Sequence, residues 1–473
     1  MIVFLWLAVC VPVIGAFLLP FFSGISEKFR NAIALLFVFC SFVCSAMLLG
    51  PCLTGNPVSV EISLPLGLSF GFLADGLAVF MAMISSFVGS IIVLYSFTYI
   101  GHYEHKSEYY LFVVLFLGAM MGLVYSTSLI FMYTFWEISA VCCWRLIGFY
   151  REKEIVYRAN KAFLVTVFGA LAMLLGFLLI YQETGTFNLI LLRGAHISDA
   201  AVILILIGML SKSATLPLHT WLPDAGVAPS PVTSLLHAAV LVKIGVYAFA
   251  RLFLVTFTID DVWHTVVPVI AAISSLVAAG AAIRENDIKR IIAYSTVSQI
   301  GFIFLGLSTG SAMGAVGGLL YILMHSLAKG GLFLCAGVVE HNAGTKDVRK
   351  LGGLWKTMPV TMVSFLLCAF SIMGIPPFGG FFSKYMVIGG AVTAGEPWLA
   401  VVFAAGAVLT FIYLLRVFTL VFFGEAKTQA SEGSRSMVAS VAGLAALSLA
   451  GGFLIYFPST FAIDIVSQMG GIR

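Results

Sequence analysis

Four lysines stand where an apolar membrane segment would not tolerate a charge without compensation. Each lies well within a long apolar run or at a break in one: Lys212, Lys243, Lys329 and Lys384. Glu137 is the only acid well inside such a run. A lysine or an acid at the centre of a bilayer costs about 2.5–3.5 kcal/mol. These side chains must therefore face protein or water, and we expect Glu137 to pair with one of the lysines.

Proton transfer is the chemistry that this set of side chains suggests. One acid leaves at least three lysines without a carboxylate partner inside the membrane, and a buried lysine without a counter-charge can lose its proton near neutral pH. His237 and His325 lie in the same apolar runs, and an imidazole titrates near neutrality when unperturbed. We interpret these residues together as a proton relay. Static ion pairs that hold helices together are the alternative.

The spacing of the polar residues places part of this relay on one helix face. Tyr321, His325 and Lys329 follow one another at intervals of four residues, which aligns them along one side of a helix. His237 and Lys243 are six residues apart and would not share a face of a regular helix.

Two of the apolar runs are interrupted by proline. Lys212 precedes Pro217, and Lys384 follows the pair Pro376 and Pro377. Proline removes a backbone donor and opens a helix, and in a membrane such breaks are tolerated where they line a cavity or are buried in protein. Two broken spans at corresponding places in two halves of the chain predict an internal repeat with ion sites near the midplane.

The composition indicates what kind of protein must position these groups. Of the 473 residues, 61% are hydrophobic and 10% are charged, whereas about 25% are charged in ordinary globular proteins. We therefore predict an all-α polytopic membrane protein. A transmembrane helix needs about 20 mostly apolar residues. About fourteen runs qualify: 2–22, 31–51, 72–98, 109–126, 128–149, 161–181, 201–221, 231–254, 265–283, 291–309, 312–339, 360–388, 397–422 and 436–456.

The predicted spans fall into four parts. Residues 1–108 hold helices 1–3, and residues 436–473 hold helix 14 and a tail. Between them, residues 109–254 (helices 4–8) and 265–422 (helices 9–13) each contain one broken span. Because each repeat has five spans, we expect the second to be inverted relative to the first. The first apolar run lacks the basic leader of a cleaved signal peptide and is counted as a span.

Charges in the loops predict the orientation. If the N-terminus is outside, fifteen lysines and arginines fall on the inner side, and only Arg193 and Arg473 fall on the outer side. Cytoplasmic loops carry an excess of such residues. We therefore expect a multi-pass protein of the cytoplasmic (inner) cell membrane with both termini on the outer side. Arg145, Lys161 and Arg251 lie near span ends, where they are expected to snorkel to the interface.

No pattern in the sequence predicts a metal or a cofactor. The eight cysteines lie nearly all in apolar runs, and no Cys/His cluster has the spacing of metal ligands. There is no ligand pattern for an iron–sulfur cluster, a flavin or a haem, so we expect no cofactor in this chain and assign any redox chemistry to partners. A nucleic-acid partner is not expected, because no basic cluster is interleaved with aromatic residues.

Five stretches of the sequence resemble one known family. They are Phe135–Trp136–Glu137, KSATLPLHTWLPDAGVAPSPVTSLLHAA from Lys212 to Ala239, DIKRIIAYSTVSQIG from Asp287 to Gly301, HSLAKGGLFL from His325 to Leu334 and GIPPFGGFFSK from Gly374 to Lys384. This is the antiporter-like subunit family shared by respiratory complex I, Mrp-type cation/proton antiporters and membrane-bound energy-converting hydrogenases. The similar stretches cover most of the chain in the family's order.

The resemblance implies roles for the relay residues of the first repeat. Glu137 is similar to the glutamate of the fifth helix, and Lys212 to the lysine of the broken seventh helix with which that glutamate pairs. His237 and Lys243 are similar to relay groups of the eighth helix.

The resemblance also implies roles in the second repeat. Lys329, with His325, is similar to the central relay of the eleventh helix, and Lys384 to the lysine of the broken twelfth helix near the exit. Tyr321 stands where some members carry a second histidine. Because the chain stops after span fourteen, the resemblance implies a mid-array or shorter subunit.

Three functions are compatible with the sequence. The first is a proton-translocating subunit of a redox-driven complex, of the energy-converting hydrogenase or complex I type. The second is a subunit of an Mrp-type sodium/proton antiporter without a redox partner. The third is an inactive membrane scaffold, against which the complete set of charged residues argues. Expected partners are the lipid bilayer, other membrane subunits including further antiporter-like ones and, for the first function, peripheral iron–sulfur subunits.

Overall fold

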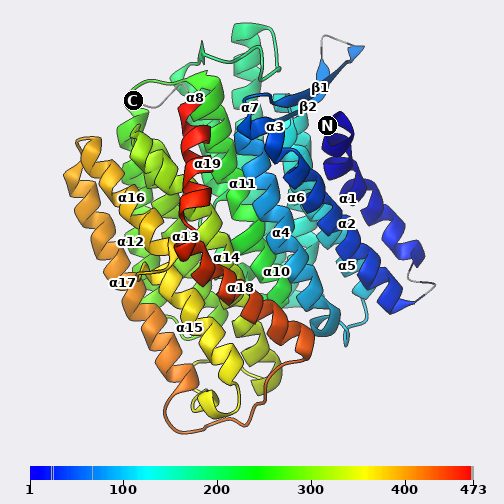
Figure 1. The fold of residues 1–473 in the computed structure, drawn as a ribbon, viewed down its shortest axis with the longest axis vertical. Helices are drawn as coiled ribbons and strands as arrows, with labels where there is room; N and C mark the ends of the chain where they lie inside the picture. Colours follow the sequence, from blue (N-terminus) through cyan, green and yellow to red (C-terminus); the bar gives the residue numbers. More distant parts are fainter. Residues whose placement is uncertain (23, 25, 66–67, 470–473) are drawn as a thin grey trace.

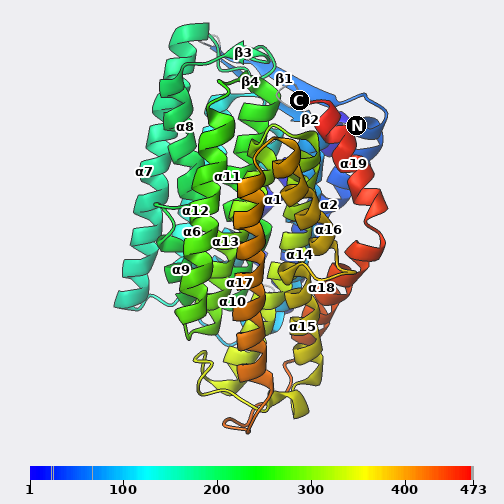
Figure 2. The same cartoon turned by 90° about the vertical axis from the view of Figure 1, so that its left-hand side faces the viewer.

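Long apolar helices make up most of the computed structural model, which describes residues 1–22, 24, 26–65 and 68–469. Within the described chain, 12 helices are long and apolar enough to cross a membrane. They stand side by side, with the connections gathered at two opposite faces (Figure 1, Figure 2). The prediction of an all-α polytopic membrane protein is confirmed.

The N-terminal part contains a small hairpin that the sequence did not predict. Asp75 accepts a hydrogen bond from the amide of Ala78 and thereby starts α4 after the hairpin. The strands β1 and β2 are antiparallel, with Val58 opposite Ala74. The elements are α1 (Ile2–Phe22), α2 (Glu27–Met47), α3 (Leu49–Leu53), β1 (Val58–Ser63), β2 (Ser69–Ala74) and α4 (Gly76–Tyr99).

The next part, up to residue 258, contains the first broken segment. The elements are α5 (Lys106–Tyr125), α6 (Leu129–Ile147), α7 (Lys153–Thr184), β3 (Ala195–His196), α8 (Asp199–Lys212), α9 (Trp221–Asp224), η2 (Ala225–Val227), α10 (Ser230–Ser234), η3 (Leu235–Ala239), α11 (Leu241–Phe249), η4 (Ala250–Thr256) and β4 (Phe257–Thr258). Because η3 and η4 are π-helical, the predicted span 231–254 is not one regular helix.

The last part contains the second broken segment. The elements are α12 (Trp263–Arg284), α13 (Ile288–Ser308), α14 (Ala312–Ala343), η5 (Leu354–Lys356), α15 (Pro359–Met373), α16 (Gly379–Thr393), α17 (Pro397–Phe422), α18 (Arg435–Phe453) and α19 (Tyr456–Ser467). Residues 456–467, which we predicted to belong to a tail, form α19 because its apolar face packs on α14 and α4. The rings of Phe461 and Phe80 are 6.1 Å apart there.

Proline lies in the non-helical part of both broken segments. Pro217 is in the turns between α8 and α9, and Pro376 and Pro377 are between α15 and α16. Side chains take over the backbone groups that the first break releases: Trp221 donates from Nε1 to the carbonyl of Ser211. Neither segment is a continuous helix, so neither belongs to the 12 long helices of the described chain.

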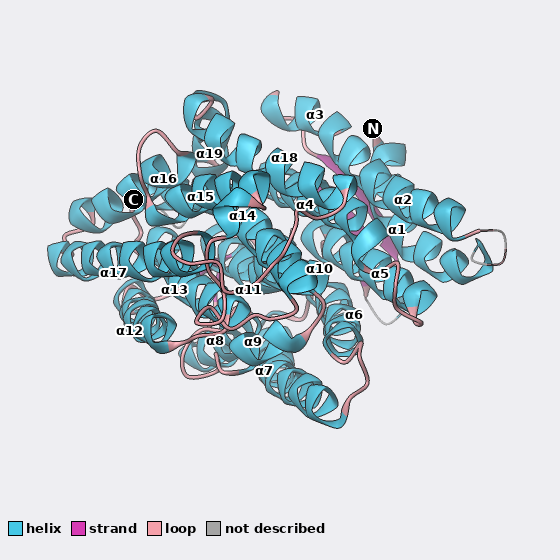
Figure 3. Cartoon of the chain, turned by 90° about the horizontal axis from the view of Figure 1, so that it is seen from below, coloured by secondary structure: helices cyan, strands magenta, loops and turns pink. Residues whose placement is uncertain are grey.

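Burial decides which helices carry polar groups. The helices α13 and α14, and the segment from α10 to η4, are almost entirely buried, whereas α1, α7 and α17 expose much of their surface. Figure 3 shows α14, α10 and α13 surrounded by the other helices. Polar side chains inside a membrane protein are tolerated when they face the bundle interior.

The start of α1 and the end of α19 lie toward one face, upper in Figure 1, and the end of α14 lies at the opposite, lower face.

The helices α14 and α16 touch through glycine. A Cβ atom added to Gly390 would overlap the Cα atom of Gly314, so the two backbones approach as closely as small residues allow.

We expect Gly390→Ala to destabilise the protein by about 1–3 kcal/mol, the usual cost of overpacking. Thermal unfolding of the purified protein measures this. Gly280→Ala is the matched control, because a Cβ at Gly280 meets nothing within 4 Å. Equal unfolding temperatures for the two variants would contradict the prediction.

Candidate proton relay

The first lysine of the predicted relay ends α8 and is completely buried. Nζ of Lys212 donates a hydrogen bond to the carbonyl of Trp136, at 3.2 Å, and lies 5.4 Å from the centre of that indole ring. The carbonyl belongs to α6, so the ammonium joins the end of α8 to the middle of α6. The break that follows Lys212 ends the helix at this point and leaves the side chain directed at its neighbour.

Glu137 does not form the direct ion pair that we expected. In the described chain, no ion pair within 4.0 Å joins Glu137 to a lysine, and the buried Oε1 atom has no hydrogen-bond partner. The groups that act electrostatically on this carboxylate are Lys212 and Tyr133. The ammonium is held by the neighbouring carbonyl of Trp136 instead. Glu137 and Lys212 are therefore near enough to interact electrostatically, but they do not form an ion pair within 4.0 Å.

We expect Glu137→Gln to lower proton transport about tenfold without preventing assembly, because an interaction of about 1.4 kcal/mol changes proton occupancy tenfold. Proton flux into vesicles that contain the assembled complex measures this. Glu152→Gln, which changes an exposed acid just before α7, is the control and should leave the flux unchanged. Full flux with Glu137→Gln would remove Glu137 from the relay.

A lysine and a histidine meet at the centre of the molecule. Nζ of Lys243 lies 2.9 Å from Nδ1 of His325 and also donates to the carbonyl of Ala238, at 2.9 Å. Lys243 and His325 are both fully buried, and they join α11 to α14. The π-helical segment η3 ends just before Lys243, and Val240, which follows it, has non-helical backbone angles. This irregularity is the reason that the carbonyl of Ala238 can accept from a side chain.

His237 lies in η3 and is separate from this contact. Its ring packs against that of Phe333 in a tilted arrangement, with centroids 4.4 Å apart. The side chain is fully buried, and neither ring nitrogen has a hydrogen-bond partner among the described residues. Charges of Lys329 and Lys243 act on it. Of the two histidines of the predicted relay, the structure therefore brings only His325 into contact with a lysine.

Lys329 continues the polar path on α14. Its Nζ atom donates to Oγ of Ser295, at 2.6 Å, and to the carbonyl of Ile292, at 3.1 Å. Tyr413, on α17, donates from its hydroxyl to the same Ser295, at 2.7 Å. Lys329 is fully buried among these groups and faces away from lipid.

A glutamine that the sequence analysis missed connects the next two residues. Nε2 of Gln299 donates to the hydroxyl of Tyr413, at 3.3 Å, and Tyr321 donates to Oε1 of Gln299, at 2.6 Å. Ser295 and Gln299 are four residues apart on α13, and this spacing of polar residues in an apolar run was the signal that could have identified them. They complete a side-chain network from Lys329 to Tyr321.

Lys384 ends this network. Its Nζ atom donates to the carbonyl of Ile372, at 2.7 Å, and lies 4.4 Å from the ring centre of Phe302 and 5.5 Å from that of Tyr321. Ile372 is in the last turn of α15, where carbonyls have no partner within the helix. The break at Pro376 therefore supplies the acceptor for Lys384.

The three charges near span ends, which we expected to snorkel, are each paired with a carboxylate. Arg251 makes two bonds to Asp75, at 2.6 and 2.7 Å, and is only 5% exposed. Lys161 binds Asp224 at 2.7 Å, and Arg145 binds Glu108. These pairs fasten helices together outside the relay.

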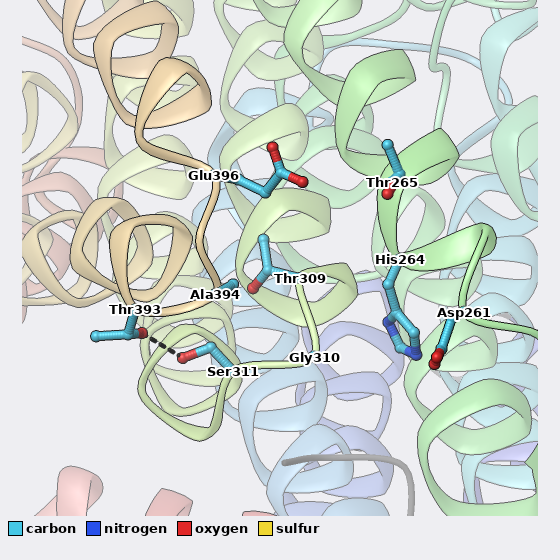
Figure 4. A pocket seen from close by; sticks show the side chains of 9 residues that line it. All are labelled: Asp261, His264, Thr265, Thr309, Gly310, Ser311, Thr393, Ala394 and Glu396. Carbon is cyan, nitrogen blue, oxygen red and sulfur yellow. Dashed lines mark hydrogen bonds between the residues drawn. The ribbon is translucent and has the colours of Figure 1, made fainter.

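A polar cavity of about 420 Å³ opens at the upper face, beyond the ends of α13 and α16 (Figure 4). The described residues of its wall carry carboxylates and hydroxyls and no lysine or arginine. Oγ1 of Thr309, 7% exposed, has no hydrogen-bond partner among the described residues. Ser311 and Thr393 bind each other at 2.8 Å. The cavity is lined by Asp261, His264, Thr265, Thr309, Gly310, Ser311, Thr393, Ala394 and Glu396.

A metal site is not found in the part of the chain that the structure describes. No group of three or more His, Cys, Asp or Glu side chains is placed to hold an ion there. The titratable side chains of the relay are ammonium, imidazole and carboxyl groups, which can bind and release protons, and the hydroxyl and amide groups hydrogen-bond with them. The arrangement is therefore suited to proton transfer.

Comparison with known proteins places this arrangement in a family. The family described as NADH:quinone oxidoreductase/Mrp antiporter, TM, matches residues 126–410, and that described as NADH-ubiquinone oxidoreductase (complex I), chain 5 N-terminus, matches residues 62–110. A Na(+)/H(+) antiporter subunit from Alkalihalophilus pseudofirmus is 34% identical, over 96% of this chain and 61% of the relative. A Na(+)/H(+) antiporter subunit from Staphylococcus aureus is 33% identical, over 98% and 62%. The chain thus spans about three-fifths of the length of these curated relatives.

Two solved structures share the fold. A chain of the Mrp complex from Dietzia sp. has a TM-score of 0.91 and 23% identity, covering 99% of this chain and 98% of that chain. A chain of the membrane-bound sulfane sulfur reductase, an archaeal respiratory membrane complex, has a TM-score of 0.90 and 24% identity, covering 98% and 97%.

Proposed function

Because this chain belongs to the NADH:quinone oxidoreductase/Mrp antiporter transmembrane family, we propose that it is an antiporter-like subunit that translocates protons within a multisubunit membrane complex. The observation that carries the proposal is the buried polar path through the centre of the molecule. It contains the Lys243–His325 contact and the network that leads from Lys329 through Gln299 to Tyr321, beneath Lys384.

Protons would move along this path from group to group. Lys212 receives a proton under the field of Glu137 and passes it inward. Lys243 and His325, at 2.9 Å, are close enough to exchange one proton directly. Lys329 follows His325 by one helical turn, and the hydroxyl of Ser295 lies within hydrogen-bond distance of it. Lys384 then takes the proton and releases it toward the upper face, where the polar cavity opens.

The architecture that we propose contains fourteen spans. Twelve are the long helices, and the other two are the broken segments α8–α9 and α15–α16. We place residues 109–254 and 265–422 as two inverted five-span repeats, supported by the similar position of the breaks at Pro217 and at Pro376. Both termini would be outside, as the loop charges indicate, so that the upper face in Figure 1 is the outer face.

The type of complex distinguishes two versions of this function. The curated relatives are named Na(+)/H(+) antiporter subunits, which favours a sodium/proton antiporter. A redox-driven complex is the second candidate, because the fold of this chain is almost as similar to the sulfane sulfur reductase chain, with a TM-score of 0.90, as to the Mrp chain, with 0.91. In either case the partners are further membrane subunits.

One experiment tests the function and separates the candidates. The chain is purified from its native membranes with its associated subunits, which are identified by mass spectrometry, and the complex is reconstituted in vesicles with a pH-sensitive dye. Proton flux driven by a sodium gradient identifies the antiporter. Flux that requires an electron donor, with an iron–sulfur subunit present, identifies the redox-driven complex. Absence of proton flux under both conditions would show that the proposal is wrong.

A further inference from the structure

We infer that Glu340, held by Lys289 at the lower face, is a proton-binding site through which protons reach the relay. This inference rests on the proposed function and adds a site to it. Glu340 lies in the last turn of α14, and Lys289 lies in the first turn of α13. Both helix ends are at the lower face, opposite the cavity of Figure 4 (Figure 1).

The two members of this pair differ in their access to water. Nζ of Lys289 lies 3.0 Å from Oε2 of Glu340 and also donates to the carbonyl of Ala228, at 2.7 Å. The lysine side chain is 1% exposed, whereas the glutamate side chain is 26% exposed. The carboxylate can therefore exchange protons with the solution. The ammonium of Lys289 favours the ionised form of Glu340, so that a proton bound there is readily released.

Hydroxyl groups adjoin the carboxylate on its inner side. Ser230, the first residue of α10, donates from Oγ to Oε2 of Glu340 at 3.0 Å. Tyr99, at the end of α4, donates to the same Oγ at 3.4 Å. Ser230 is fully buried and Tyr99 nearly so. A proton on Glu340 thus has a buried hydroxyl within hydrogen-bond distance.

A polar stripe leads from this hydroxyl toward the relay. Ser230, Ser234 and His237 follow one another at intervals of four and three residues and all contact α14. Ser234 donates to the carbonyl of Gly330, at 3.3 Å, and the ring of His237 packs against that of Phe333. His237 is buried with both ring nitrogens unpartnered among the described residues. An imidazole nitrogen without a partner is a ready proton acceptor.

One proton moves from water at the lower face to His237 in the proposed transfer. Glu340 takes one proton from water at the lower face. Ser230 accepts this proton and gives up its own. Because Ser230, Ser234 and His237 do not hydrogen-bond to one another in the described chain, water molecules must carry a proton from Ser230 to Ser234 and from Ser234 to His237, and no hydroxyl changes its charge. His237 receives the proton and becomes an imidazolium within the field of Lys329 and Lys243. That repulsion favours passing the charge onward.

Other charged and titratable groups lie near Glu340 at the lower face. His341, next to Glu340 on α14, stacks with His102 of the loop after α4, at 6.0 Å between ring centres. The ring of Tyr99 lies 5.4 Å from that of His341. Lys346, which pairs with Asp287 at 3.3 Å, acts electrostatically on Glu340. The surroundings of Glu340 at the lower face are therefore polar.

The test compares single and double variants in the reconstituted complex. Glu340→Gln removes the titratable proton, and we expect proton flux to fall about 100-fold or more, the usual contribution of a positioned proton-transfer group. Glu340→Asp, which still titrates, should retain part of the flux. The double variant Lys289→Gln/Glu340→Gln removes both charges, so that neither is left buried without a partner. It should assemble and still fail to transport.

Infrared difference spectra on acidification provide a reading that a purely structural pair would not change. The band of protonated carboxyl groups should be smaller in Glu340→Gln than in the wild type, by the contribution of one carboxyl group. The matched control is Glu27→Gln/Lys106→Gln, which removes an ion pair of similar length, 2.8 Å, with a largely exposed carboxylate. Its flux should equal that of the wild type.

The outcomes separate this inference from the proposed function. If the wild type transports protons and the Lys289→Gln/Glu340→Gln variant does so at the same rate, the pair is a static link between helices and the inference is wrong. A carboxyl band of equal size in the wild type and in Glu340→Gln would also overturn it. If the wild type itself moves no protons, the proposed function fails and the site loses its role.

Discussion

Replacing Lys384 with arginine should abolish proton transport while the complex still assembles. A guanidinium group stays protonated at any usable pH, so that it supplies the positive charge but cannot release a proton. Lys384 donates to the carbonyl of Ile372 and lies over two aromatic rings, contacts that an arginine can reproduce. We expect a loss of about 100-fold or more, measured as proton flux into vesicles that contain the reconstituted complex.

The control for this variant is Lys427→Arg. Lys427 is exposed and donates to the carbonyl of Arg349 at 3.1 Å, so its replacement tests the general effect of a lysine-to-arginine change. Full transport with Lys384→Arg would show that only fixed positive charge is needed at this position, and the proton-carrying role would have to be withdrawn.

Replacing His325 with asparagine should block the relay at its centre. The amide oxygen of asparagine can still accept a hydrogen bond from Lys243, so the link between α11 and α14 can survive in part. An amide does not carry a proton near neutral pH, however, and the transfer from Lys243 would end there. We expect proton flux to fall about 100-fold or more, with assembly and thermal stability close to those of the wild type.

The control replaces a histidine outside the relay. His196 is exposed and pairs with Asp260 at 2.9 Å, and His196→Asn should leave the flux unchanged. If His325→Asn transports at the wild-type rate, Lys243 must pass its proton by a route that does not include the imidazole. The Lys243–His325 contact would then be structural.

The cost of placing a charge in a membrane explains what could be predicted from the sequence. This cost acts on each residue according to its type and its surroundings in the chain, so the burial of lysines such as Lys329 could be predicted from their apolar neighbours alone. The same argument predicted a polytopic helical protein. The proline positions could be placed in broken segments because proline acts on its own helix.

Which side chains of different helices meet could not be predicted from the sequence and is known only from the tertiary structure. Lys243 and His325 are 82 residues apart, and their meeting depends on how α11 and α14 are rotated, which the π-helical segment before Lys243 changes. Rotation also decides that Lys212 faces the carbonyl of Trp136 and not the carboxylate of Glu137. A sequence pattern reports which face of one helix is polar, but it does not report which face of a distant helix lies opposite.

The same limit explains the residues that were missed. Gln299 and Glu340 were not selected from the sequence, because one polar side chain near others in a helix is compatible with many neighbours. In the packed structure, Gln299 hydrogen-bonds with the hydroxyls of Tyr321 and Tyr413. Glu340 forms an ion pair with the ammonium of Lys289. The sequence by itself thus determined that this protein buries titratable groups in a helical membrane body. Only the tertiary structure decided which of these groups touch, because contact is a property of the packed helices and not of any one segment.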